Sequence, residues 1–101
     1  MGLLKVLNHV ERCYSNEDGA VIHALLLSEL KSDEKVTLSF EDIEWVTSSF
    51  VNTALIDLLE EFDFSYIKSH LKFTKTTKQI NDMIKRRFKF EVEERKKLIH
   101  I

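Results

Sequence analysis

Hydrophobic positions change their spacing along the chain, and each spacing predicts a strand or a helix. Residues 3–10 mix leucine and valine with single polar residues, which predicts a short strand. Turn-forming residues occupy positions 15–19, and hydrophobic residues then recur at helical spacing over residues 21–31. Residues 36–40 (VTLSF) alternate hydrophobic with polar positions, so we expect a second strand there.

The clearest helical pattern lies in the middle of the chain. A single apolar stripe predicts one helix from residue 51 to residue 62; its members are Val51, Leu55, Leu58, Leu59 and Phe62. The hydroxyl cluster before this stripe supplies the N-cap, because a Ser or Thr oxygen accepts a hydrogen bond from an unpaired amide of the first turn. The candidates are Thr47, Ser48 and Ser49.

The last third of the chain gives mixed signals. Residues 65–69 have the composition of a connection, and residues 71–73 predict a short strand. A further helix begins after Thr76 or Thr77. Beyond Arg87 the signals conflict, because residues 88–92 alternate like a strand whereas residues 91–97 have helical propensity and charge pairing. The apolar end, LIHI, has to dock on another surface, for which a second copy of the chain is a candidate.

Strand, helix, strand, helix, strand, helix is the order of an α/β fold. We therefore expect a small mixed or largely parallel sheet with amphipathic helices, whose exposed edges favour pairing with another chain, including a homodimer. The 101 residues suffice for one core, so residues 1–101 are predicted to form a single domain.

The composition excludes several classes of site. The chain has two glycines, and no glycine-rich phosphate loop can be built from Gly2 and Gly19. It has one cysteine and four histidines that are isolated in the sequence, so we expect no metal site and no cofactor. Cys13 has no disulfide partner, and the first residues resemble neither a signal peptide nor a membrane span, so we expect a cytoplasmic protein.

The net charge of −2 conceals a strong asymmetry. Residues 1–71 carry 5 Lys and Arg against 13 Asp and Glu, whereas residues 72–101 carry 10 against 4. Within the basic segment, Phe88 and Phe90 alternate with a basic patch, as in grooves that bind single-stranded nucleic acid. The patch consists of Lys85, Arg86, Arg87 and Lys89. Solvated basic residues beside core phenylalanines explain the same pattern, and we favour that interpretation.

Residues 36–62 read VTLSFEDIEWVTSSFVNTALIDLLEEF, which is a strand, an acidic turn, a hydroxyl cluster and a helix. This segment resembles the core of a STAS domain (sulfate transporter and anti-sigma factor antagonist). Ser48 and Ser49 match the two hydroxyl positions of that family, whereas Thr47 stands where the family has an aspartate. Phe50-Val51-Asn52 replaces the family's Gly-Leu-Gly. With this replacement the chain, over about residues 18–88, is similar to a narrower bacterial branch, the STAS-like domains of unknown function.

The resemblance implies a fold and a function. In the STAS family a partner kinase can phosphorylate the loop serine that opens the helix, so Ser48 and Ser49 are candidate phosphoacceptors. The STAS-like branch occurs near or fused to histidine-kinase-type ATPase domains, so such an ATPase is the expected partner. The expected contact residues are Thr47, Ser48, Phe50 and Asn52. Helix capping alone also accounts for the hydroxyl cluster.

We therefore expect a non-enzymatic regulatory module that binds a protein partner through residues 47–52 and contacts no membrane. The alternative is a small nucleic-acid-binding protein that uses the basic residues 72–97, which predicts binding that falls steeply with salt. A third hypothesis, an enzyme built around Asp42 and Glu44, predicts a deep acidic pocket at that turn.

Overall fold

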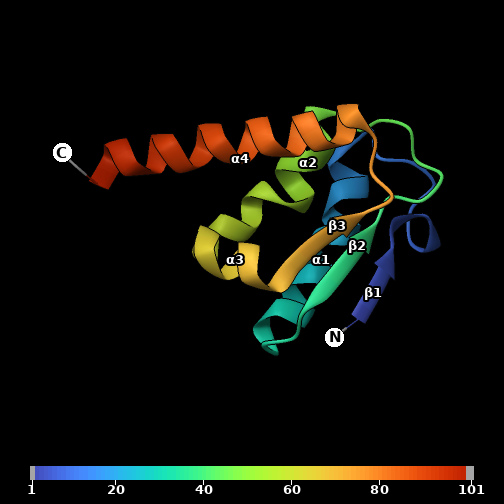
Figure 1. The fold of residues 1–101 in the computed structure, drawn as a ribbon, viewed down its shortest axis with the longest axis horizontal. Helices are drawn as coiled ribbons and strands as arrows, with labels where there is room; N and C mark the ends of the chain where they lie inside the picture. Colours follow the sequence, from blue (N-terminus) through green and yellow to red (C-terminus); the bar gives the residue numbers. More distant parts are fainter. Residues whose placement is uncertain (1, 100–101) are drawn as a thin grey trace.

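The computed structural model describes residues 2–99, and the side chains of residues 2–95. Strands and helices alternate along the chain, with two short 3-10 helices between them (Figure 1). The elements in order are β1 (Gly2–Lys5), η1 (Val6–Asn8), α1 (Asn16–Lys31), β2 (Val36–Ser39), α2 (Ser48–Ala54), η2 (Ile56–Glu60), α3 (Phe64–His70), β3 (Leu71–Thr74) and α4 (Lys78–Ile99).

The three strands form one sheet in the order β1-β2-β3, and both strand pairs are parallel. Parallel neighbours need a crossover connection; α1 links β1 to β2, and the segment from α2 to α3 links β2 to β3. The predicted α/β class and the alternation of strands and helices are confirmed, and the described sheet is parallel throughout rather than mixed. The first strand is shorter than the predicted residues 3–10, because it ends at Lys5 and a 3-10 helix follows.

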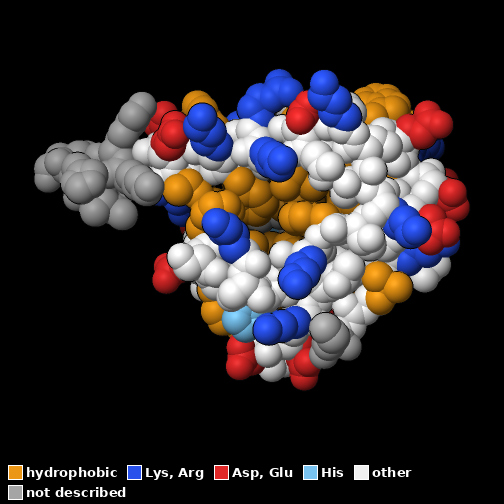
Figure 2. Space-filling view, in the orientation of Figure 1, with side chains coloured by type: hydrophobic (Ala, Val, Ile, Leu, Met, Phe, Trp, Pro, Cys, Tyr) orange, Lys and Arg blue, Asp and Glu red, His pale blue; other side chains and the backbone are white. Residues whose placement is uncertain are grey.

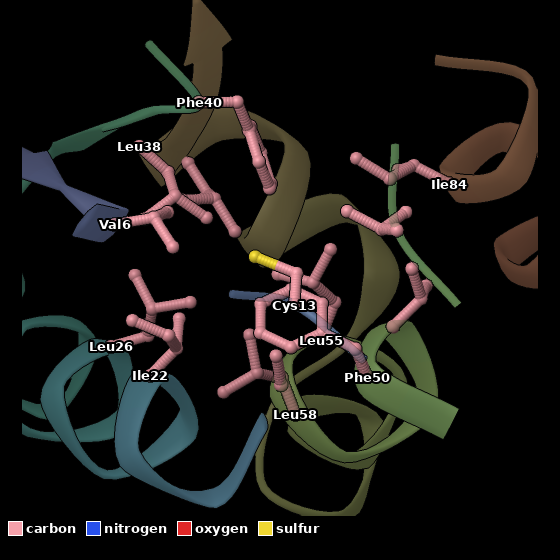
Figure 3. Close-up of a cluster of buried hydrophobic side chains, with 14 of the residues drawn as sticks. Val6, Cys13, Ile22, Leu26, Leu38, Phe40, Phe50, Leu55, Leu58 and Ile84 are labelled. Atoms are coloured by element: carbon pink, nitrogen blue, oxygen red, sulfur yellow. The ribbon is translucent and has the colours of Figure 1, made fainter. Parts of the chain in front are cut away.

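The core lies on the face of the sheet that the helices cover. Leu38 of β2 is in register with Leu4 and Phe73, so these three side chains point to the same side. Figure 3 shows side chains from the sheet, α1 and α2 meeting there, with the sulfur of Cys13 among them. On the opposite face of the sheet, Leu3 is 71% exposed and Lys72 is also exposed.

Helices α1 and α2 approach each other closely at Gly19. A Cβ atom on this glycine would lie 2.9 Å from the carbonyl oxygen of Phe50 and 2.9 Å from Cβ of Thr53. The sequence placed Gly19 in a turn, but α1 already begins at Asn16, where Ser15 caps it by accepting a 3.1 Å hydrogen bond from the Asp18 amide. Gly19 therefore serves helix packing rather than a turn.

The predicted helix over residues 51–62 is wrong in its extent. The α-helix ends at Ala54, and a 3-10 helix follows from Ile56 to Glu60. Ala54, Leu55 and Ile56 are consecutive, and each is at most 4% exposed. A 3-10 helix has three residues per turn, so the chain is wound more tightly after Ala54 than in α2.

The predicted connection at residues 65–69 is also wrong, because these residues belong to α3. Contacts with distant parts of the chain hold this short helix. The Tyr66 hydroxyl donates a 2.6 Å hydrogen bond to the Leu30 carbonyl, and its ring stacks on His70 with 3.9 Å between centroids. Nε2 of His70 lies 2.7 Å from Oδ1 of Asp33.

The conflict beyond Arg87 is resolved in favour of a helix. Helix α4 is continuous from Lys78 to Ile99, and its C-terminal part extends past the sheet (Figure 1). Thr77 is the hydroxyl that caps it, accepting a 3.3 Å hydrogen bond from the Ile80 amide. The expected docking of the apolar end falls on residues 98–101, whose side chains lie outside the described part of the chain.

Candidate functional site

The loop between β2 and α2 is fastened to the start of α4. The Gln79 side chain forms two 2.9 Å hydrogen bonds with Val46: its Nε2 donates to the carbonyl oxygen, and its Oε1 accepts from the amide. Thr77 Oγ1 donates a 2.8 Å hydrogen bond to the Glu44 carbonyl. Between these anchors and β2 the chain turns at Asp42, whose φ of 67° lies in a region that aspartate tolerates better than most residues.

Thr47 joins this loop to α2 and to the segment after β1. Its Oγ1 accepts a 3.2 Å hydrogen bond from the Phe50 amide and donates a 2.9 Å hydrogen bond to the Tyr14 carbonyl. Its amide donates to the Cys13 carbonyl at 3.1 Å. Thr47 is therefore the N-cap among the three candidates, and it also fixes the position of Tyr14.

The residues predicted to contact a partner divide into exposed and internal groups. Ser48 and Ser49 are exposed at the start of α2. Phe50 is fully buried in the hydrophobic core (Figure 3), which corrects its expected place among the contact residues, because a partner cannot reach the ring there. Asn52 is partly buried, and its Oδ1 accepts a 2.7 Å hydrogen bond from Nε of Arg87.

An exposed aromatic pair lies near the start of α2, because Trp45 closely precedes Ser48 in the chain and the Tyr14 carbonyl is bonded to Thr47. The rings of Tyr14 and Trp45 stack with 4.7 Å between centroids, although the two residues are 42% and 46% exposed. The Arg12 guanidinium lies 5.9 Å from the centre of the Tyr14 ring. We call the exposed residues Tyr14, Trp45, Ser48 and Ser49 the loop surface.

The hydroxyl cluster marked Ser48 and Ser49 in the sequence, but the aromatic members of the loop surface come from the structure. Trp45 is exposed in the turn between β2 and α2, although a tryptophan in a domain of this size is most often part of the core. No pattern marks Tyr14, because its position depends on the hydrogen bond between its carbonyl and Thr47, 33 residues away.

A small acidic hollow lies next to the aromatic pair. Its volume is about 260 Å³, and its lining includes Glu11, Asp42 and Glu44, all exposed, and Cys13. Burial, with a smaller contribution from the Asp18 carboxylate, raises the pKa of Cys13 to about 12, so this thiol is protonated at neutral pH. Within residues 2–99, no group of three or more His, Cys, Asp or Glu is placed to hold a metal ion.

The four residues of the basic patch lie in different surroundings. Arg87 is partly buried, where its side chain bonds Asn52, forms a 3.1 Å ion pair with Glu91 and lies 5.4 Å from the centre of the Phe90 ring. Arg86 is exposed, while Lys85 and Lys89 border a hollow between α4, α3 and β3. The acidic side chains of Glu91 and Glu93 follow on the same helix.

Part of the sequence matches the model of a known protein family. The family model described as STAS-like domain of unknown function (DUF4325) matches residues 18–81, more than half of the chain. The chain belongs to this family. Neither the curated proteins nor the solved structures include a significant match to this STAS-like domain. The match covers the loop surface apart from Tyr14 and ends near the start of α4. Across residues 2–99, none of the helices combines the length and the apolar content needed to span a bilayer.

Proposed function

We propose that this STAS-like domain is a non-enzymatic regulatory module that binds a histidine-kinase-type ATPase through the loop surface. The observation that carries the proposal is the stacked, half-exposed pair of Tyr14 and Trp45. This pair lies at the start of the short helix α2, whose first two residues, Ser48 and Ser49, are exposed. The resemblance of residues 36–62 to the core of STAS domains supports a regulatory role.

The chemistry of this surface suits a protein partner. Large aromatic side chains often supply most of the energy of an interface, because they bury a wide apolar area at a small loss of conformational freedom. The loop that carries Trp45 is already held by Gln79, Thr77 and Thr47. Ordering this loop would therefore add little to the free-energy cost of binding a partner.

Ser48 and Ser49 give this surface a candidate switch. Both serines are exposed, so a kinase can reach them without opening the core. A phosphate would add about −1.5 to −2 charges to a loop that already carries Asp42 and Glu44. Such a change would repel an acidic patch on the partner or attract an arginine there.

Calorimetric titration of this domain with a histidine-kinase-type ATPase of the same organism tests the binding proposal. Trp45→Ala should weaken binding about tenfold or more, as expected for loss of a central aromatic anchor. Phe90→Ala is the matched control, because Phe90 is 52% exposed on α4 away from the loop surface, and binding should stay unchanged. Equal affinity of the Trp45→Ala variant and the unmodified protein would refute the assignment of this surface.

Phosphorylation is tested separately. After incubation with the ATPase and ATP, mass spectrometry should place a phosphate on Ser48 or Ser49. Ser48→Glu should weaken binding, whereas Ser65→Glu, at an exposed position on α3, should not. If binding depends on Trp45 while no phosphate appears, the loop surface remains the interface and the hydroxyl cluster serves as a helix cap only.

A further inference from the structure

A second, larger hollow lies between α3, β3 and α4, away from the loop surface. Its volume is about 640 Å³, within the range of pockets that bind small molecules. Figure 2 shows it as a recess of hydrophobic side chains ringed by Lys and Arg. The residues that α4 contributes begin at Asn81, at the end of the family match, so most of them lie outside it.

The floor of this hollow is apolar. It is formed by side chains from all three elements: Phe64, Ile67, Leu71, Phe73, Ile84 and Phe88. Phe64 and Phe88 pack together with 5.2 Å between ring centroids, and Phe88 is 5% exposed. Val92 extends the floor along α4.

The rim of the hollow is cationic. Lys68 stands on α3, with its ammonium 5.5 Å from the centre of the Phe64 ring, and Lys85 and Lys89 stand on α4. Among the described lining residues, Glu93 is the one acidic side chain, at the α4 end that carries Val92. Lysines of α3 and α4 therefore border one apolar floor, so a single ligand on this floor can contact the lysines of both helices.

We propose that this hollow binds a long-chain carboxylate, with the alkyl chain on the floor and the carboxylate between the rim lysines. An alkyl chain has no polar group to satisfy, so it fits a floor without hydrogen-bond donors or acceptors. An extended peptide would bring backbone N–H and C=O groups that need partners when buried. A second copy of this surface would bring its own three lysines against these three, which opposes self-association here.

Calorimetric titration with laurate, below its critical micelle concentration, tests this proposal. Acetate supplies the carboxylate alone, and dodecyltrimethylammonium supplies the same chain with the opposite charge. Laurate should bind at a stoichiometry of one, and acetate should not bind. Dodecyltrimethylammonium should bind about tenfold more weakly than laurate, because the rim repels its head group.

Variants locate the binding site. Lys85→Glu with Lys89→Glu should weaken laurate binding about tenfold, since both charges at the α4 rim are reversed. The control is Lys78→Glu with Arg86→Glu, two exposed residues of the same helix that do not line the hollow, and its affinity should match the unmodified protein. Val92→Trp, which fills the α4 end of the hollow, should also weaken binding while the circular dichroism spectrum is retained.

Three results would overturn the proposal. The first is absence of laurate binding to the unmodified protein. The second is an equal loss of affinity in the rim variant and the α4 control. The third is tight binding of an acidic amphipathic helical peptide that responds to these variants while laurate does not bind, which would identify the hollow as a protein-docking groove.

Discussion

Replacing Gly19 by alanine tests how closely α1 packs against the helix that carries the site. Alanine is the better helix former by about 1 kcal/mol, so helix propensity alone predicts a more stable protein. The packing predicts the opposite. The new Cβ would lie 2.9 Å from the Phe50 carbonyl oxygen and 3.2 Å from the Ala54 amide nitrogen, and both atoms belong to the backbone of α2.

Backbone atoms can move away only if α1 and α2 separate, which disturbs the core around Phe50. Overpacking of this kind typically costs about 1–3 kcal/mol. After the gain of about 1 kcal/mol in helix propensity is subtracted, we expect Gly19→Ala to lower the free energy of unfolding by up to about 2 kcal/mol. In a domain of this size each kcal/mol corresponds to about 4–8 °C in Tm.

Urea unfolding followed by circular dichroism measures this difference. Ala24→Gly is the matched control, because Ala24 is exposed on the same helix. This substitution measures the difference in helix propensity between alanine and glycine without a contact to α2. Ala24→Gly should lower the stability by about 1 kcal/mol. If Gly19→Ala instead raises the stability by a similar amount, α1 and α2 are not packed as described.

Two further predictions concern the residues that build the site. Thr47→Val keeps the shape of the side chain but removes both hydrogen bonds of its hydroxyl, so the free energy of unfolding should fall by about 2 kcal/mol. Thr47→Ser keeps a hydroxyl and should keep most of the stability. Equal free energies of unfolding for the two variants would contradict the capping role. The pKa of Cys13 is raised from 9.0 to about 12, so at pH 8 the folded protein should contain roughly a thousandfold less thiolate than the unfolded protein. Iodoacetamide should therefore modify Cys13 far more slowly in the folded protein than in urea. Modification at similar rates would show that the thiol is accessible.

Local patterns in the sequence were sufficient for some parts of this fold. The alternation at residues 36–40 identified β2, and the hydroxyl cluster before an apolar stripe identified the cap of α2, because both depend on neighbours within a few residues. The STAS-like resemblance rested on this same segment, which the family match confirms.

The remaining features depend on contacts between distant segments. Phe50 was expected at an interface because it lies in the segment that resembles the STAS loop, but its side chain packs in the core. The turn-like sequence around Gly19 could not reveal the close approach of α1 to α2. Tyr14 carried no signal, since its exposure beside Trp45 follows from a bond to Thr47. Helix α3 likewise depends on the bond between Tyr66 and Leu30.

The most direct test of the proposed function uses the single tryptophan of the chain, whose indole N–H gives one resolved signal in a nitrogen-correlated NMR spectrum. Titration with the histidine-kinase-type ATPase should shift or broaden the Trp45 indole signal together with the amide signals of Tyr14, Ser48 and Ser49. The exposed residues of α4, including Phe90, should remain unaffected. Binding that perturbs α4 and leaves the Trp45 indole signal in place would contradict the assignment of the loop surface as the partner interface.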